Sequence, residues 1–321
     1  MRTAAEVVIV GGGCMGCSVA WHLAARGLTD VVLIEREAQL ATGSTGRNAG
    51  GVRHQFSHPA NIALSIESIA MMRDFEARVG PPIDFHQDGY LFLVSRAANV
   101  AAFQQNIALQ QQMGVDVQWL DPAEAASHAP GIDTTGLRGA AWCAADGVAD
   151  PNGVTMGFAK GAQARGVEIV RDTEVTGIRL EHGRVAGVQT SRGTIATPLV
   201  VNAAGPWAKA IGRYCGVDVP VTPERRHIFI ATPERGASWD AAEWDGRMPR
   251  SRVLVIDFES TFYFHREGSG LLFGMGDPDE TPGFDLTVRW DFLPRVTEVA
   301  DAGCPRWRMP PSHTRGRAST R

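Results

Sequence analysis

A glycine-rich turn between two apolar runs constrains the fold of this chain more than any other feature of its sequence. Residues 7–10 (VVIV) are an apolar run typical of a buried strand, and a second run, residues 31–34 (VVLI), ends at Glu35. Between the runs, a helical pattern follows three glycines with the spacing G-x-G-x-x-G, namely Gly11, Gly13 and Gly16. This order predicts a β-α-β unit that binds a dinucleotide.

Each part of this unit has a physical role. Gly11 permits a tight turn, Gly13 lets the backbone approach a pyrophosphate, and Gly16 lets the helix pack on the strand. Free N–H groups at the start of the helix then face the phosphates. Glu35 lies where a carboxylate accepts hydrogen bonds from a ribose diol, and its charge disfavours the 2′-phosphate of NADP. The alternative is a glycine-rich turn in an unrelated α/β protein.

The length and composition are those of a globular protein. With 321 residues the chain is expected to form about two domains, and its 44% hydrophobic residues can fill a core. A net charge of −4 gives no reason to expect nucleic acid or an anionic membrane as a partner. No run approaches the ~18 apolar residues of a membrane span. The first strand begins almost at once, so we expect no signal peptide and a cytoplasmic location.

The five cysteines do not indicate a disulfide framework, because their number is odd. Cys14 and Cys17 form a C-x-x-C inside the glycine turn, for which a redox or zinc site is the alternative interpretation. No second C-x-x-C is present, and the turn is already assigned to phosphate. We therefore interpret both cysteines as small side chains that suit a crowded helix start.

The rest of the chain alternates helical and strand patterns. Helices are expected over residues 59–79, 97–113 and 155–164, and after Asp121-Pro122. Strands are expected over residues 84–94 with a turn at Asp88-Gly89, over 167–170, 174–180, 184–190 and 199–203, and within 217–276. A hairpin is expected at His182-Gly183. The chain thus crosses twice between two layers, which predicts discontinuous domains.

Five segments, in this order, resemble the FAD-dependent amine oxidoreductases, a family that includes D-amino-acid oxidase, sarcosine oxidase and dimethylglycine dehydrogenase. They read VVIVGGGCMGCSVAWHLAARG, VVLIERE, GSTGRNAGGVRHQFS, DGVADP and VVNAAGPWA. The segment GGVRHQFS is closest to the sarcosine and dimethylglycine branch. The resemblance implies an α/β fold, in which a Rossmann-like FAD-binding domain joins an α+β second domain built on a largely antiparallel β-sheet.

The resemblance also implies how the chain divides between the two domains. The FAD-binding domain is expected to comprise residues 1–82 and 146–215. The substrate domain is expected to comprise residues 83–145 and 216–300.

A set of FAD contacts follows from the resemblance. The ADP half is contacted by Gly11, Gly13, Gly16, Glu35 and Arg36. The pyrophosphate and the flavin edge are contacted by Ser44, Thr45, Asn48, Gly50 and Gly51. Adenine meets the backbone of Val175, and a second turn contacts the cofactor through Ala203, Ala204, Gly205 and Trp207. The alternatives are a flexible surface loop over residues 43–53 and a plain strand-to-helix turn at Ala204.

Arg53 is the residue that the resemblance selects for the substrate, because an arginine at this place pairs with the substrate carboxylate. A guanidinium suits a carboxylate since it makes two parallel charge-assisted hydrogen bonds. A surface salt bridge is the alternative, and Arg47 is the alternative substrate residue. Tyr263 and Arg266 belong to the strand FYFHRE, which in the family faces the substrate cavity. Strand alternation leaves open which aromatic residue points inward.

Three histidines complete the candidate residues. His54 and His58 lie four residues apart, but no third ligand is evident, so we predict no metal site. For His227, a core position and a position facing the flavin both stay open.

The chemistry that the resemblance implies is hydride transfer to flavin N5 from the carbon next to a secondary or tertiary amine, which gives an imine. The expected substrate is an N-methyl amino acid such as sarcosine or dimethylglycine, and the electron acceptor is oxygen or an electron-transfer protein. The alternatives are a D-amino-acid oxidase or dehydrogenase, a non-catalytic remnant, and a nucleotide-binding subunit of a hetero-oligomer. A plain NAD-dependent dehydrogenase is disfavoured by the loop STGRNAGGVR.

The last 21 residues differ in composition from the rest of the chain. They contain five arginines and three prolines but no Leu, Ile, Val or Phe. A motif of the type G-x-x-x-x-T-P-D, expected in the family after residue 300, is not present. We therefore expect the family match to stop near residue 300, in a copy that lacks its C-terminal segment, and residues 301–321 to be a disordered tail. A natural basic tail is the alternative.

Overall fold

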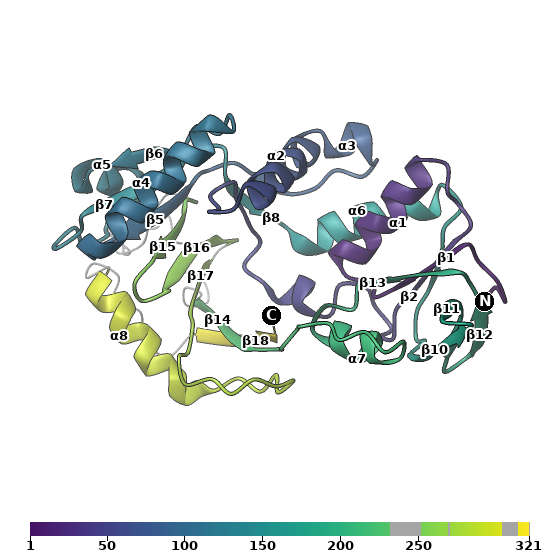
Figure 1. The fold of residues 1–321 in the computed structure, drawn as a ribbon. Coiled ribbons are helices and arrows are strands. Elements are labelled where there is room, and N and C mark those ends of the chain that lie inside the picture. The colour runs from purple at the N-terminus through teal and green to yellow at the C-terminus, as the bar shows by residue number, and fades with distance from the viewer. Residues whose placement is uncertain (232–251, 269, 304–313, 321) are drawn as a thin grey trace.

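The computed structural model describes residues 1–231, 252–268, 270–303 and 314–320 (Figure 1). Its N-terminal part is the predicted β-α-β unit, formed by β1 (Val7–Val10), α1 (Cys14–Ala25) and β2 (Val31–Ile34). Both strands have the predicted bounds. With β13 (Leu199–Asn202) and β9 (Glu168–Val170) they form a parallel sheet in the order β13-β1-β2-β9.

The parallel sheet is buried on both faces, which explains why β1 and β2 are apolar throughout. Val7, Ile9 and the equivalent positions of β2 pack with α1 and α6 (Pro151–Gln163) in one cluster. Val8 and Val10 pack on the other face against α7 (Ala208–Arg213) and a small sheet. This three-stranded sheet is formed by β10 (Val175–Glu181), β11 (Arg184–Thr190) and β12 (Gly193–Ala196).

A second, larger sheet has eight strands in the order β18-β14-β17-β16-β15-β5-β7-β6. Its strands are β5 (Tyr90–Val94), β6 (Gln118–Leu120), β7 (Gly139–Cys143), β14 (Arg225–Ala231), β15 (Leu254–Asp257), β16 (Tyr263–Glu267), β17 (Gly270–Met275) and β18 (Thr314–Thr320). All neighbours pair antiparallel except β15 and β5. The predicted largely antiparallel sheet is therefore confirmed.

Helices cover both faces of this sheet. On one face, α5 (Pro122–His128) and α8 (Leu293–Gly303) close the largest hydrophobic cluster. On the other face lie α2 (Pro59–Arg73) and α4 (Ala97–Gln112), which place Ile62 and Ile107 in a separate cluster. Figure 1 shows that the large sheet lies at one end of the molecule and the parallel sheet at the other. No helix of the described residues is long and apolar enough to span a membrane.

A short sheet links the two parts. It has the order β3-β8-β4 and consists of β3 (Gly51–Val52), β8 (Gly147–Ala149) and β4 (Phe85–His86). The remaining elements are α3 (Phe75–Arg78) and the single 3-10 turns η1 (Ser44–Arg47), η2 (Gly205–Trp207) and η4 (Trp290–Phe292).

Several predicted elements differ in detail. The helix expected over residues 59–79 is divided at Asp74 into α2 and α3. The strand expected over residues 84–94 is divided at the predicted turn, Asp88-Gly89, into β4 and β5. The two strands lie in different sheets, since β4 pairs with β8 and β5 pairs with β7 and β15. The hairpin is confirmed, with His182 and Gly183 both at positive φ.

The prediction of a disordered tail from residue 301 is wrong at the residues that the structure describes there. Helix α8 continues to Gly303, and β18 pairs antiparallel with β14, from Arg225 opposite Thr320 to Ala231 opposite Thr314. An edge strand is held by backbone N–H and C=O groups, so the absence of large apolar residues does not prevent pairing. The rest of the expected tail, 304–313 and 321, lies outside the described residues.

Candidate cofactor and substrate site

The glycine turn between β1 and α1 is closely packed and requires its glycines. Gly11 has φ of 111°, and a Cβ there would overlap the carbonyl oxygen of Ala203. A Cβ at Gly16 would overlap the carbonyl oxygen of Gly11. Both glycines are therefore required by close packing within the protein, and their role toward a dinucleotide stays a prediction.

Glu35 is held at the end of β2 with its carboxylate facing the turn. Its Oε2 accepts a hydrogen bond from the Gly12 N–H at 2.7 Å, and its Oε1 accepts one from the Glu37 N–H at 2.9 Å. Each carboxylate oxygen has a further lone pair, so Glu35 can still accept from the two hydroxyls of a ribose. Beside it, the Arg36 guanidinium lies 3.8 Å from the centre of the Trp207 ring.

A cavity of about 720 Å³ begins at this turn, within the ~300–1,000 Å³ typical of ligand pockets. Most of the predicted FAD contacts line it, namely Gly11, Gly13, Glu35, Arg36, Ser44, Thr45, Val175, Ala203, Ala204, Gly205 and Trp207. Gly16 does not line the cavity, because it is a buried residue within α1. Leu286 also lines the cavity, and Phe284 stacks on Trp207 with 5.1 Å between ring centres. Neither Leu286 nor Phe284 stands out by any local pattern in the sequence.

The loop over residues 43–53 is ordered by internal hydrogen bonds rather than being a flexible surface loop. The Thr45 hydroxyl accepts from the Cys14 N–H at 3.1 Å, which ties the loop to α1. Asn48 accepts from the Gly50 N–H at 2.6 Å and donates to the Thr45 carbonyl. The Arg47 guanidinium donates to the carbonyl of Thr42, the residue just before the loop, so Arg47 stabilises the loop.

The end of this loop pairs with the DGVADP segment. Gly51 pairs with Val148, and the Ala149 N–H donates to the Gly50 carbonyl at 2.9 Å. Gly50 has φ of 70°, a conformation that favours glycine. The backbone at Gly50 and Gly51 is therefore held at a defined place between the parallel sheet and the large sheet.

Arg53 follows directly and lies among aromatic rings. Its guanidinium carbon is 4.7 Å from the centre of the Phe56 ring, 5.1 Å from Phe92 and 5.8 Å from Tyr90. It lines a second cavity, of about 270 Å³, between α4 and the large sheet. Within the described ranges, no carboxylate forms an ion pair with Arg53.

The strand β16 places its residues on two faces of the large sheet. Phe264 and Arg266 pair with Phe273 and Leu271, whose side chains belong to the cluster under α5 and α8. Arg266 thus lies on the face away from the loop. Tyr263 lies on the opposite face and packs against the cluster of Ala49, Ile228 and Leu272. Alternation alone had left this choice open.

His265 is a residue of this strand that the sequence analysis did not select. It is buried, and its Nε2 lies 2.9 Å from the Ala49 carbonyl oxygen, while its Nδ1 lies 2.8 Å from the Arg266 carbonyl oxygen. The ring therefore connects the large sheet to the loop that precedes Gly50. Only the three-dimensional pairing of segments more than 200 residues apart shows this role.

The other histidines and the C-x-x-C have structural roles. His58 caps α2 by accepting from the Ala60 N–H, whereas His54 faces Asp146, so the two are not a metal pair. His227 is buried, and its Nε2 accepts from the Arg289 N–H. Burial raises the pKa of the Cys14 thiol and raises that of Cys17 to about 12, which does not suit a redox pair.

Comparison with known proteins agrees with this geometry. Residues 6–317 match the family model described as FAD dependent oxidoreductase, so the prediction that the match stops near residue 300 is wrong. The chain is 33% identical over 280 residues to the mitochondrial sarcosine dehydrogenase of Homo sapiens, which covers 85% of this chain and 29% of that protein. It is 30% identical over 315 residues to the mitochondrial dimethylglycine dehydrogenase of Rattus norvegicus, covering 93% and 35%.

The chain therefore spans about a third of the length of these two curated relatives. Among solved structures, the L-proline dehydrogenase from P. horikoshii superposes with a TM-score of 0.87 at 30% identity, over 100% of this chain and 82% of that chain. The glycine turn, the carboxylate at the end of β2 and the cavity between them all fit the cofactor that the family uses. The chain belongs to the family of FAD-dependent oxidoreductases, and FAD is its cofactor.

Proposed function

We propose that this chain oxidises a secondary or tertiary amine that carries a carboxylate, of the N-methyl amino acid type represented by sarcosine and dimethylglycine. Bound FAD supplies the acceptor for a hydride from the carbon next to the amine nitrogen, which leaves an imine that water hydrolyses. The names of the two curated relatives support this substrate class. The chain's own task is to bind the acid and to orient its amine.

The geometry of Arg53 carries the proposal. Its guanidinium lies at a cavity, two residues after the glycines assigned to the flavin edge, and the described residues offer it aromatic rings and no carboxylate. Stacking on rings leaves the edge of a guanidinium, with its N–H groups, available to a carboxylate. A substrate acid would therefore supply the two acceptors that Arg53 lacks.

The residues around Arg53 suit a small amine. Phe56, Phe92, Phe103 and Ala141 give the second cavity an apolar lining, and a volume of about 270 Å³ suits a molecule the size of an amino acid. Tyr263 lies on the face of the large sheet that the flavin loop covers. We therefore propose Arg53 and Tyr263 as substrate-facing residues. Arg266 lies on the other face of the large sheet and is not proposed to contact the substrate.

A substrate panel tests the proposal. The FAD-loaded protein should oxidise dimethylglycine and sarcosine with release of formaldehyde, and should oxidise trimethylamine, which lacks the carboxylate, much more slowly. Arg53→Ala should lower kcat/KM for dimethylglycine about ten- to a hundredfold, the range expected for hydrogen bonds between charged groups. Preference for D-alanine over both N-methyl acids would instead identify a D-amino-acid oxidase. Running the assay with oxygen and with an artificial electron-accepting dye distinguishes the two acceptor classes.

A further inference from the structure

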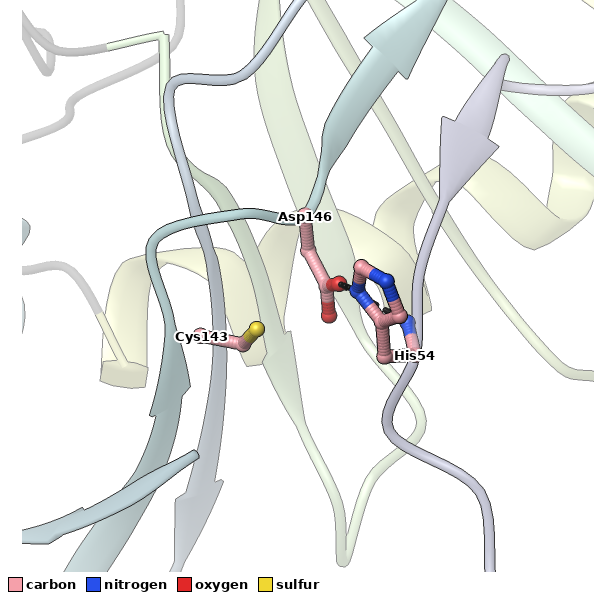
Figure 2. A group of neighbouring side chains, drawn as sticks. All are labelled: His54, Cys143 and Asp146. Atoms are coloured by element: carbon pink, nitrogen blue, oxygen red, sulfur yellow. Dashed lines mark hydrogen bonds and ion pairs between the residues drawn. The ribbon is translucent and has the colours of Figure 1, made fainter. Parts of the chain in front are cut away.

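Asp146, the first residue of the DGVADP segment, has no part in the function proposed above, yet its side chain is completely buried. Its Oδ1 accepts from the His54 N–H at 2.8 Å and lies 2.6 Å from Nδ1 of the His54 ring. Its Oδ2 accepts from the Gln55 side-chain amide at 3.1 Å. Figure 2 shows the His54 ring nitrogen facing the carboxylate. An ionised carboxylate only accepts, so Nδ1 carries the proton of this contact.

The same residues invite a metal interpretation, because donor atoms of His54, Cys143 and Asp146 all lie within 4.8 Å of one another. The hydrogen bonds argue against it. The Asp146 Oδ1 already accepts from both N–H groups of His54, and the His54 Nδ1 that faces it carries a proton and so has no lone pair for a metal. Burial, together with the Asp146 charge, raises the pKa of the Cys143 thiol to about 12, which disfavours a thiolate ligand. The cluster is a hydrogen-bonded group.

Both chain neighbours of Arg53 are bonded to the beginning of the DGVADP segment. On one side, Val52 pairs with Gly147 between β3 and β8. On the other side, both the backbone and the ring of His54 contact Asp146. The close fit of this segment is evident at Gly147, where a Cβ would overlap the carbonyl oxygen of His86. Arg53 therefore starts from a backbone that is fixed before and after it.

The rings around Arg53 are tied to the same residue. The Gly89 N–H donates to the Asp146 carbonyl at 3.0 Å, immediately before β5 begins at Tyr90. The Gln55 amide, which donates to the Asp146 carboxylate, also donates to the Tyr90 carbonyl at 3.0 Å. Asp146 thus connects the backbone that carries Arg53 with the strand that carries two of its three ring contacts.

We propose that Asp146 is a positioning residue, which holds the Arg53 guanidinium at the place where a substrate carboxylate binds. Contacts with ring faces are weakly directional, so they cannot fix the guanidinium by themselves. Two parallel hydrogen bonds to a carboxylate require a defined orientation, and orientation fixed before binding reduces the entropy lost on binding. The inference rests on the proposed function, since Asp146 is expected to affect the binding of ligands that carry a carboxylate and not the binding of amines that lack one.

The test compares the binding of two ligands, dimethylglycine and trimethylamine, to the FAD-loaded protein. The flavin is first reduced with dithionite under anaerobic conditions so that it cannot oxidise either amine, and the dissociation constants are then measured by calorimetry. Asp146→Asn keeps the shape of the side chain but replaces one acceptor oxygen by an N–H₂ donor, so it cannot accept from both His54 and Gln55. We expect this variant to bind dimethylglycine about tenfold more weakly and trimethylamine less than about twofold more weakly, as for the loss of one well-oriented charged hydrogen bond.

Asp150→Asn is the matched control, since it changes the same charge in the same segment. Asp150 caps α6 by accepting from the Asn152 and Gly153 N–H groups, so its change should lower the unfolding temperature without altering the ratio of the two constants. In the double variant with Arg53→Ala, Asp146→Asn should cause no further change in that ratio, because Asp146 acts through Arg53.

The outcomes separate the two proposals. If Asp146→Asn weakens the binding of both ligands equally, Asp146 is merely structural and the inference is wrong. The same holds if Asp150→Asn changes the ratio of the two dissociation constants as much as Asp146→Asn does. If Arg53→Ala leaves the ratio at its wild-type value, the proposed function fails, and the inference fails with it. Should Asp146→Asn not fold, His54→Phe removes the ring donor and keeps the backbone N–H. It should then shift the ratio about threefold, and an unchanged ratio would overturn the inference.

Discussion

Replacing Arg225 should destabilise the protein strongly, because it would leave a buried carboxylate without a partner. Arg225 opens β14, and its guanidinium makes two parallel hydrogen bonds to Glu280, at 2.9 and 3.0 Å. The two side chains are only 9% and 4% exposed. Arg225 also donates to the Thr287 carbonyl at 2.9 Å, so it ties a segment beyond β17 to the sheet.

The magnitude follows from this burial. Removing one partner of a buried ion pair typically costs about 3–5 kcal/mol, because the other charge stays buried and unpaired. We expect that loss in the free energy of unfolding for Arg225→Met. The double variant Arg225→Met/Glu280→Met should lose less than the sum of the single variants, since neither charge is then left in the core. Arg78→Met, in an exposed pair with Asp74, should cost less than about 0.5 kcal/mol.

The pH dependence has a definite sign. The hydrogen bonds from Arg225 hold the pKa of Glu280 below its ordinary value. A depressed folded-state pKa contributes stability that is complete above the ordinary pKa of ~4.3 and is lost as the pH falls through the lower folded-state value. The difference in stability between the wild-type protein and Glu280→Gln should therefore be full at pH 7 and shrink below about pH 4.

Urea unfolding followed by circular dichroism measures the free energy of unfolding of each variant. Flavin fluorescence measures the rate of FAD release. Leu286 lines the cavity in which FAD is predicted to bind, and Phe284 stacks on Trp207, so loosening this segment should also speed FAD release. A loss of less than about 1 kcal/mol in Arg225→Met, or strict additivity in the double variant, would refute the reasoning.

Three further predictions concern single sites. Glu35→Ala should weaken FAD binding by about 1.5–3 kcal/mol, the contribution of charged hydrogen bonds, as measured by titration of the apoprotein with FAD. Gly16→Ala should prevent α1 from packing and give protein with little bound FAD, whereas Gly27→Ala, where a new Cβ would meet no atom, should retain it and show only the strain of its positive φ. Cys143 should resist alkylation at pH 8 in the folded protein, because its raised pKa leaves little thiolate. It should react once the protein is unfolded, and rapid labelling of the native state would contradict this prediction.

The sequence predicts the structure of the β-α-β unit well because its signals are local. The apolar runs at residues 7–10 and 31–34 have strand length, and the glycine spacing between them follows from the contacts that the turn must make. The same holds for the hairpin at His182-Gly183, where both residues adopt positive φ. In these places neighbouring residues alone determine the conformation.

Local signals fail where distant segments decide. The pattern of residues 84–94 predicts a strand with a turn at Asp88-Gly89, but not that β4 and β5 belong to different sheets, because β8 and β15 supply separate partners. Arg266 is a substrate candidate by sequence, but which face of the large sheet it lies on depends on how β16 pairs with β17. Asp146 and His265 act through contacts with residues 92 and 216 positions away, which no local pattern contains.

The most direct test of the account is the reduction of bound flavin by a carboxylated amine. The purified, FAD-loaded protein is mixed anaerobically with dimethylglycine or with trimethylamine, and the blue absorbance of the flavin is followed in time. We predict that dimethylglycine bleaches the flavin in the wild-type protein, that trimethylamine does so far more slowly, and that Arg53→Ala removes the difference between the two. Equal bleaching by both amines in the wild-type protein, or an unchanged preference in Arg53→Ala, would contradict the role of Arg53.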